Sequence, residues 1–125
     1  MLALDYGAAR TGVAVSDPTG TLARPLCVVQ RAASEAGLAR LAELVRDEQV
    51  ERVVVGLPLT LRGERGAQVG ETERFLKALR EVIDVPVDTF DERFTTALAA
   101  GGGDAPEDAR AAAHLLSSYL AWASR

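Results

Sequence analysis

The run Val53-Val54-Val55-Gly56-Leu57 is continuously apolar, and Pro58 ends it. A short apolar run rich in β-branched residues, without polar alternation, is typical of a strand buried on both faces of a parallel sheet. Residues 53–57 therefore predict the central strand of an α/β fold, and the rest of the chain can be placed around it.

Three further strands are expected before this run. Residues 2–6, 11–16 and 25–30 are short apolar or β-branched segments, and turn-forming residues separate them at 7–10 and 17–20. Strands joined by such short turns pair antiparallel. The first thirty residues therefore predict a three-stranded antiparallel meander.

Helical periodicity begins after the meander, with Ser34 as the expected N-cap. Apolar residues recur there at helical spacing, as they do in a second expected helix over 72–83 and in a last helix beginning near 104–107. Asp104 precedes Glu107 by three residues, in the manner of a capping box. The apolar positions of the first helix are Leu38, Leu41, Ala42 and Val45, and those of the last are Ala112, Leu116, Tyr119, Leu120 and Ala123.

One more strand is expected at 85–90, and Pro86 favours an edge position for it. Residues 59–70 are expected to form a polar loop. The predicted order is β-β-β-α-β-α-β-α, which gives a five-stranded mixed sheet with flanking helices.

Size and composition point to one domain over residues 1–125. Hydrophobic residues make up 48% and charged residues 26% of the chain, as in globular proteins. We find no signal peptide and no membrane span, and expect a soluble, cytoplasmic protein without membrane contact. The net charge of −4 argues against a protein that coats nucleic acid by bulk charge, but it allows local basic patches.

Carboxylates at three places in the chain stand out by their positions. Asp5 closes the first strand, Asp91 and Glu92 follow the last strand, and Asp108 lies in the first turn of the last helix, turned inward with its apolar stripe. If the first strand runs parallel to residues 53–57, these groups meet at the carboxyl edge of the sheet, where sites form in open α/β folds. Singly, each carboxylate could also be a turn or helix-cap residue.

Converging carboxylates repel one another unless a cation neutralises them. All-oxygen ligand sets suit Mg²⁺ or Mn²⁺. Two such ions roughly 3.5–4 Å apart can activate a water and stabilise the leaving oxygen in phosphodiester hydrolysis.

Basic residues are expected near the same edge. Arg62 and Arg65 belong to the loop after the central strand, and Arg93 follows Glu92. Phosphate contacts are the expected role of some of them. Arg74 and Lys77, on the next helix, could equally be ordinary surface charges.

Several other residues are more easily read as structural. Cys27 is expected to be a small buried hydrophobe, and the lone His114 cannot build a histidine-rich metal site. Trp122, with Leu115, is the most exposed candidate for an interface on the last helix, although both could belong to the core.

Four motifs also resemble those of a known family. They are Asp5-Tyr6-Gly7 with Arg10, Gly12, Ala14 and Ser16-Asp17; Gly56-Leu57-Pro58-Leu59 with Gly63 and Gly66; Asp91-Glu92-Arg93 with Thr95-Thr96; and Asp108 before Ala111-Ala112-Ala113, Leu116, Tyr119 and Leu120. In order and over nearly the whole chain, they resemble the YqgF/RuvX family, whose members are described as Holliday junction resolvases or pre-16S rRNA nucleases.

The resemblance implies an RNase H-like fold and divalent-metal nuclease chemistry. By this resemblance Asp5, Glu92 and Asp108 would be the catalytic metal ligands, with Asp91 a weaker candidate ligand. Nucleic acid, either branched DNA or an rRNA precursor, would be the partner, with Arg10, Arg62, Arg65 and Arg93 as its contacts. A homodimer would suit a two-fold symmetric junction.

Two other functions stay open at this point. A phosphotransferase of the sugar-kinase and actin type also begins with Asp-x-Gly on a first strand, but it needs a second lobe to enclose the nucleotide. A non-catalytic nucleic-acid or ribosome-binding module would keep the fold and lose the chemistry. The sequence does not indicate which substrate is chosen, which metal is preferred or how many copies assemble.

Overall fold

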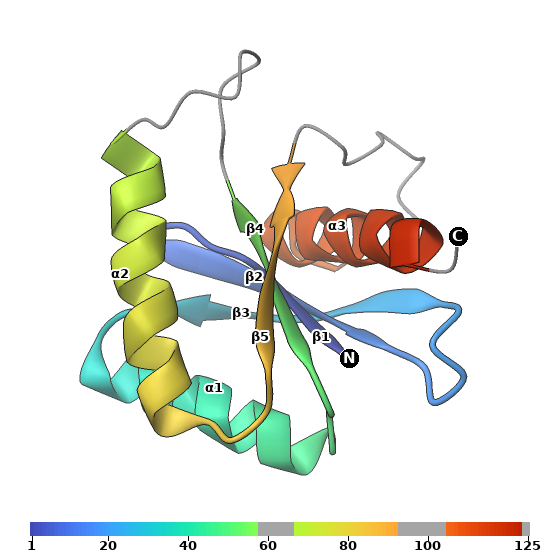
Figure 1. Cartoon of the computed structure of the whole chain (residues 1–125), viewed down its shortest axis with the longest axis horizontal. Helices are drawn as coiled ribbons and strands as arrows, with labels where there is room; N and C mark the ends of the chain where they lie inside the picture. The colour runs from blue at the N-terminus through green and yellow to red at the C-terminus, as the bar shows by residue number, and fades with distance from the viewer. Residues whose placement is uncertain (58–66, 93–104, 124–125) are drawn as a thin grey trace.

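Five strands and three helices make up the computed structural model of the chain, which describes residues 1–57, 67–92 and 105–123. They follow the predicted order β-β-β-α-β-α-β-α (Figure 1). Their bounds are β1 Leu2–Asp5, β2 Arg10–Ser16, β3 Ala23–Gln30, α1 Glu35–Asp47, β4 Val53–Leu57, α2 Ala67–Val82, β5 Val87–Asp91 and α3 Glu107–Ala123.

The strands form one mixed sheet in the spatial order β3-β2-β1-β4-β5. Strands β1, β2 and β3 pair antiparallel, whereas β1, β4 and β5 run parallel to one another. The predicted meander, the central strand and the edge position of the last strand are therefore confirmed. Strand β5 begins only at Val87, so Pro86 lies before it, and the Pro86 carbonyl accepts a hydrogen bond from the Val53 amide at 2.9 Å.

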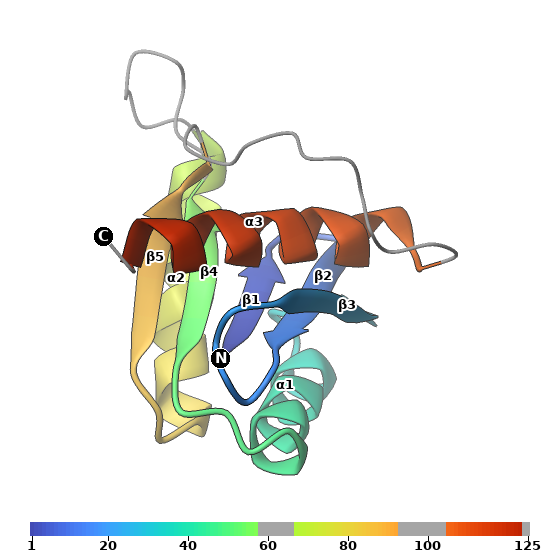
Figure 2. The ribbon, with the colours of Figure 1, turned by 90° about the vertical axis from the view of Figure 1, so that its right-hand side faces the viewer.

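Helices cover both faces of the sheet (Figures 1 and 2). Helices α1 and α2 pack on one face, and α3 crosses the other face. Of the described helices, none is long and apolar enough to cross a membrane.

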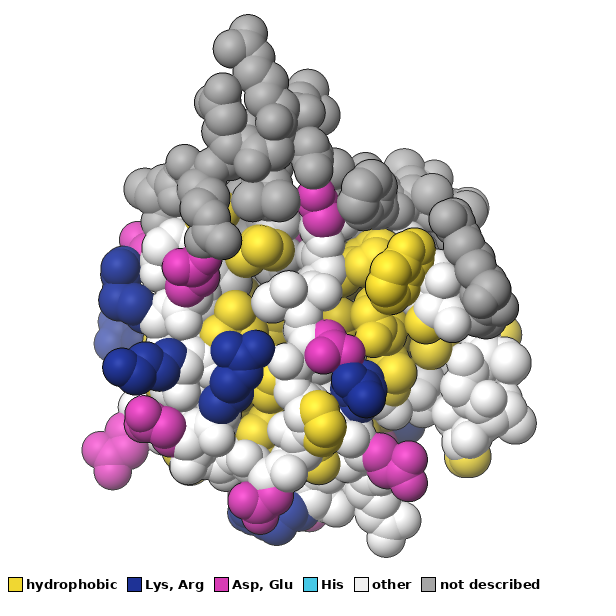
Figure 3. Space-filling model, in the orientation of Figure 1, with side chains coloured by type: hydrophobic (Ala, Val, Ile, Leu, Met, Phe, Trp, Pro, Cys, Tyr) yellow, Lys and Arg dark blue, Asp and Glu magenta, His cyan; other side chains and the backbone are white. Residues whose placement is uncertain are grey.

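Acidic and basic side chains are interspersed over the face seen in Figure 3, with hydrophobic side chains exposed between them. This mixture agrees with the small net charge of −4. A positively or negatively charged partner would therefore be bound by a local group of residues, because neither positive nor negative side chains dominate this face.

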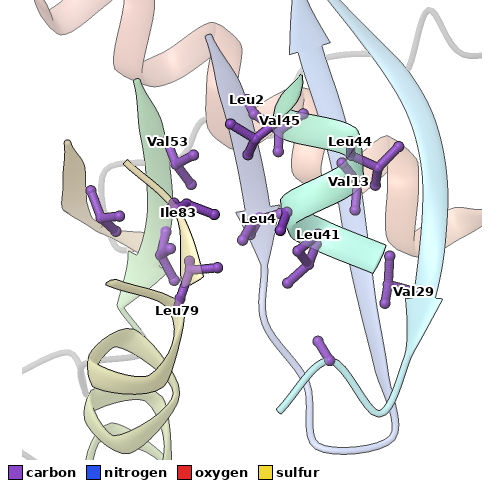
Figure 4. Close-up of a cluster of buried hydrophobic side chains, with 14 of the residues drawn as sticks. Leu2, Leu4, Val13, Val29, Leu41, Leu44, Val45, Val53, Leu79 and Ile83 are labelled. Carbon is purple, nitrogen blue, oxygen red and sulfur yellow. The ribbon is translucent and has the colours of Figure 1, made fainter. Parts of the chain in front are cut away.

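Strand alternation divides the core into two layers. Leu2 and Leu4 point toward α1 and α2, whereas Ala3 points toward α3. Figure 4 shows the first layer, in which Leu4 lies with Leu41 of α1 and Leu79 of α2. The same alternation carries the side chain of residue 5 to the α3 face, where the candidate site lies.

Helix α1 starts as predicted, since the Ser34 hydroxyl accepts a hydrogen bond from the Gly37 amide at 3.0 Å. Helix α2 starts at Ala67, so the expected loop over 59–70 is too long at its C-terminal end. The expected capping box begins at Asp104, which lies outside the described residues. Cys27 is only half-buried, because β3 is an edge strand.

Gly12 determines how closely α3 approaches the sheet. A Cβ atom added to Gly12 would lie 1.7 Å from the backbone oxygen of Asp108 and 2.3 Å from its carbonyl carbon. The first turn of α3 therefore rests directly on β2, at the residue paired with Asp5. This contact fixes where the helix places Asp108.

Candidate active site

Asp5 and Glu92 meet at the carboxyl edge of the sheet. Asp5 ends β1 and Glu92 follows β5, and the two carboxyl groups share a hydrogen bond. Burial raises the pKa of both groups. The hydrogen bond opposes the rise at Asp5 and adds to it at Glu92, whose pKa rises to about 7.

Gly56 makes room for this pair between β1 and β5. A Cβ atom on Gly56 would lie 2.7 Å from Glu92 Oε1 and 3.1 Å from Leu115 Cδ2. The Glu92 carboxyl group therefore lies over the end of the central strand, in space that any other residue would fill.

Asp108 approaches the pair from α3. Its negative charge contributes to the raised pKa of Asp5, so the two carboxylates interact. Asp108 also forms an ion pair with Arg10, whose Nε lies 3.2 Å from Asp108 Oδ2. The Asp108 side chain is 38% exposed, so it lies at the rim of the site, still reachable from solvent.

Asp91 lies beside the site, but strand alternation places its side chain on the opposite face of the sheet. Its charge helps to raise the pKa of Glu92. By strand alternation the Asp91 side chain falls on the face of Val87, which packs with α1 and α2, and not on the face of Glu92. Among the predicted basic contacts, Arg62, Arg65 and Arg93 lie outside the described residues.

A pocket of about 210 Å³ opens on the Asp5 and Glu92 carboxyl groups. Glu71 and Thr72 of α2 also line it, and the sequence reasoning did not include them among the site residues. Glu71 could have been found if the helix had been predicted to begin at Ala67. A helix that begins there places Glu71 in its second turn, close to the sheet edge. The pocket lining is Asp5, Tyr6, Gly7, Ala8, Glu71, Thr72 and Glu92.

Tyr6 fixes α2 beside this pocket. Its ring stacks on Phe75 of α2, with the ring centroids 4.3 Å apart and the planes inclined by 15°. Burial and the charge of Glu71 raise the pKa of Tyr6, so its hydroxyl stays protonated near neutral pH. The stacked rings therefore connect the residue after Asp5 to the helix that carries Glu71.

A divalent cation can be tested against these residues. Within residues 1–57, 67–92 and 105–123, no three His, Cys, Asp or Glu side chains are gathered into a group that could hold a metal ion. Asp5 and Glu92 share a proton, and Asp108 has Arg10 as its positive partner. The possible ligands are nevertheless all carboxylate oxygens, and a positive charge between Asp5 and Glu92 would lower the raised pKa of both groups. This chemistry fits Mg²⁺ or Mn²⁺.

Comparison with known proteins adds the family. A family model described as "RuvX: Holliday junction resolvase" matches residues 1–122. The chain belongs to the RuvX family. This membership places it among nucleases and confirms the family resemblance seen in the four motifs.

Relatives of this RuvX chain carry the name "Putative pre-16S rRNA nuclease". The protein from Chloroflexus aggregans is 46% identical over 99 residues, which are 79% of this chain and 70% of that protein. The Chloroflexus aurantiacus protein (strain J-10-fl) shows the same identity over 79% of this chain and 65% of its own length. The Syntrophomonas wolfei protein is 37% identical over 130 residues, which are 96% of this chain and 92% of that protein.

Solved structures show the same fold. This RuvX chain superposes on Thermus thermophilus RuvC in complex with a Holliday junction substrate with a TM-score of 0.60 and 24% identity, covering 99% of this chain and 97% of that one. A second Thermus thermophilus RuvC structure gives a TM-score of 0.57 at 23% identity, covering 98% and 97%. The fold is therefore RNase H-like, as the sequence resemblance implied.

The shared proton predicts a pH-dependent stability of the metal-free RuvX chain. Glu92 titrates at about 7 in the folded protein and at its ordinary value of 4.5 when unfolded. Between these values the folded state binds more protons, so the free energy of unfolding falls as the pH rises. We expect the melting temperature in EDTA to fall from about pH 5 to about pH 7 and then to level off.

Glu92→Gln tests this origin of the pH dependence. The variant cannot ionise, so its melting temperature should change less over the same range. An unchanged slope in the variant would show that other groups cause it.

Gly56→Ala should damage activity more than stability. The added Cβ meets the carboxyl end of Glu92, which can turn away, so we expect a stability loss of about 1 kcal/mol. A displaced carboxylate should lower kcat about 10- to 100-fold. Gly70→Ala is the matched control, because its Cβ would meet only Arg74 at 3.7 Å and alanine favours the helix. Equal activity in both variants would contradict this placement of Glu92.

Proposed function

We propose that this chain is a divalent-metal-dependent nuclease that hydrolyses phosphodiester bonds in structured nucleic acid, with Mg²⁺ or Mn²⁺ as its cofactor. The observation that carries the proposal is the contact between the Asp5 and Glu92 carboxyl groups, with Asp108 beside them. Carboxyl groups that must share a proton near neutral pH form a site in need of a cation. Membership of the RuvX family supports the same chemistry.

Asp5 and Asp108 would hold the cation, and Glu92 would either hold it or orient the attacking water. The bound cation would supply Lewis-acid activation of that water and stabilisation of the leaving oxygen. Beside a bound cation the Glu92 carboxyl group would be ionised, and as a carboxylate it could accept a hydrogen bond from that water. In the proposed reaction the water oxygen would bond to the phosphorus as the P–O bond to the leaving oxygen breaks; the water would release a proton to the solvent, and the leaving oxygen would take one up from the solvent.

Arg10 would contribute in two states. Without a cation it neutralises Asp108 across 3.2 Å. Its side chain is 67% exposed, so it can turn to a phosphate when a cation takes over that neutralising role. We propose Arg10, Arg62, Arg65 and Arg93 as contacts to the nucleic-acid backbone.

The substrate would be branched DNA or an rRNA precursor. The family description favours the first and the names of the relatives favour the second. A cleavage assay with a four-way DNA junction, single-stranded DNA, single-stranded RNA and a 5′-extended 16S rRNA precursor separates them. Each substrate is tested with Mg²⁺, with Mn²⁺ and with EDTA.

We expect metal-dependent cleavage of at least one substrate, and its loss in a folded Asp108→Asn variant. Millimolar Mg²⁺ or Mn²⁺ should also raise the melting temperature, because a ligand that binds only the folded state stabilises it. Absence of both effects would overturn the nuclease proposal and favour a non-catalytic binding module.

A further inference from the structure

Trp122 is a large aromatic side chain left exposed on a structured element. It is the only tryptophan of the chain, lies near the C-terminal end of α3, and is 52% exposed. Leu22 and Val82 are the other large hydrophobic side chains found exposed in residues 1–57, 67–92 and 105–123, and both are aliphatic. Leu115, which the sequence left open between an exposed interface residue and a core residue, is buried at 2% and belongs to the core.

Neighbouring rings hold Trp122 in place. Its ring centroid lies 5.9 Å from that of Tyr119 and 6.1 Å from that of Phe90. Phe90 and Tyr119 are nearly buried and meet edge to face, with centroids 5.6 Å apart. The indole is therefore held by two neighbouring rings and is still half exposed, so a flat partner could bind it at little entropic cost.

Trp122 lies on the side of α3 that faces the candidate site. Asp108, Leu115 and Trp122 are spaced by seven residues, so they fall on one face of the helix. Leu115 Cδ2 contacts the end of the central strand beside Glu92. One helical rise per residue places Trp122 about 10 Å further along this face than Leu115.

The position of Trp122 relative to strand β5 also places it near the candidate site. Phe90 contacts Trp122, and Glu92, the residue directly after β5, lies two residues further along the chain, about 7 Å away. A nucleic-acid strand with a phosphate at the Asp5 and Glu92 carboxyl groups would reach the indole within a few nucleotides.

Charge beside the aromatic group also suits a nucleic acid. The Tyr119 hydroxyl donates a hydrogen bond to Asp88 at 3.0 Å, and Arg52 forms an ion pair with the same carboxylate. The Arg52 and Asp88 side chains are 41% and 39% exposed, so this ion pair adds no net negative charge beside the rings that would repel a phosphate. Figure 3 shows hydrophobic side chains over this part of the molecule with charged side chains beside them.

We propose that Trp122 stacks on an unpaired base of the nucleic-acid substrate, a few nucleotides from the scissile phosphate. The proposal rests on the proposed nuclease function and narrows its substrate to nucleic acid with unpaired bases beside the cleavage position. Stacking suits an exposed aromatic platform because every base presents a π face, and it requires that the base is not covered by its neighbours in a duplex.

The single tryptophan makes a direct test practical. The intrinsic fluorescence of Trp122 is followed in EDTA, so that no cleavage occurs, during titration with a single-stranded 12-mer oligonucleotide. An abasic 12-mer with the same phosphates and the same sequence as a closed duplex are the matched probes. We expect saturable quenching by the single strand and much weaker quenching by the other two. Equal quenching by the abasic strand, or no quenching, would overturn the proposal.

Variants give the second readout, by fluorescence anisotropy of a labelled single-stranded oligonucleotide. Trp122→Ala should weaken binding about tenfold, and Trp122→Phe should keep most of it. Leu22→Ala, which removes an exposed aliphatic side chain in the turn between β2 and β3, should leave binding unchanged. Equal weakening by Trp122→Ala and Leu22→Ala would contradict stacking.

The two proposals fail in distinguishable ways. Oligonucleotide binding that is indifferent to Trp122→Ala removes the stacking role and leaves metal-dependent cleavage standing. Quenching without any metal-dependent cleavage removes the nuclease function and leaves a base-binding surface. A tryptophan emission that shifts with protein concentration alone would show that a second copy covers this surface, and would overturn the stacking proposal.

Discussion

Replacing Asp5 by asparagine should lower the rate of the proposed phosphodiester cleavage about a thousandfold, because the proposed cation, which Asp5 would hold, would be worth several kcal/mol to the transition state. The same change should leave the metal-free protein at least as stable as the wild type. It removes one of two carboxyl groups that now share a proton, and relieves the repulsion from Asp108. Lost activity without lost stability is the signature expected of a metal ligand.

Single-turnover cleavage and thermal melting measure the two effects. We expect Mg²⁺ to raise the melting temperature of the wild type and to leave that of the variant unchanged. Asp84→Asn is the control, since Asp84 is an exposed aspartate before β5, at the opposite end of that strand from Glu92. A folded Asp5→Asn protein that cleaves as fast as the wild type would refute the assignment of Asp5.

Replacing Gly12 by alanine should destabilise the fold by about 3 kcal/mol. The new Cβ would lie 1.7 Å from a backbone oxygen of α3, and backbone atoms cannot turn aside as a side chain can. Relief requires α3 to move off the sheet, which opens its packing against β1 and β2. Because Asp108 moves with the helix, activity should fall as well.

Urea denaturation checks the size of this effect, with a lower midpoint at unchanged slope as the expected result. Gly20→Ala is the comparison. Its Cβ would meet nothing within 4 Å, although its φ of +71° lies in the left-handed region and costs about 1 kcal/mol for alanine. Gly20→Ala should keep full activity. Similar losses of stability in both variants would show that the contact between β2 and α3 is not the cause.

Local periodicity was enough to predict most of the fold. Strand alternation and helical spacing depend on the chain itself, so the order of elements, the meander and the parallel central strand all agree with the structure. The start of α2 was placed too late, because Gly63, Gly66 and Gly70 give this stretch the composition of a loop.

The part of the site that lies at the strand ends could be predicted from the sequence. Asp5 and Glu92 each sit where a parallel strand finishes, and parallel strands end at one edge, so their meeting follows from the topology. The ion pair between Arg10 and Asp108 and the approach of Glu71 do not follow in this way. They depend on how two helices lie across the sheet, which side-chain packing decides.

Leu115 and Trp122 illustrate the same limit. Both lie on one face of α3, and sequence spacing cannot tell them apart. Leu115 is buried because the central strand lies beneath it, whereas Trp122 lies by β5, the last strand of the sheet. The two residues differ in exposure because Leu115 lies over the middle of the sheet and Trp122 lies at its edge.

Helix α3 packs directly on Gly12, so the position of Asp108 does not depend on the length of the chain that precedes the helix. Added or deleted residues ahead of Ala105 would alter the connection and leave the carboxylate where β2 holds it. One residue inserted between Ala109 and Ala112 would instead turn Asp108 about 100° away from the apolar stripe that packs on the sheet. Natural length variation in such nucleases should therefore gather before this helix and be rare within its first turns.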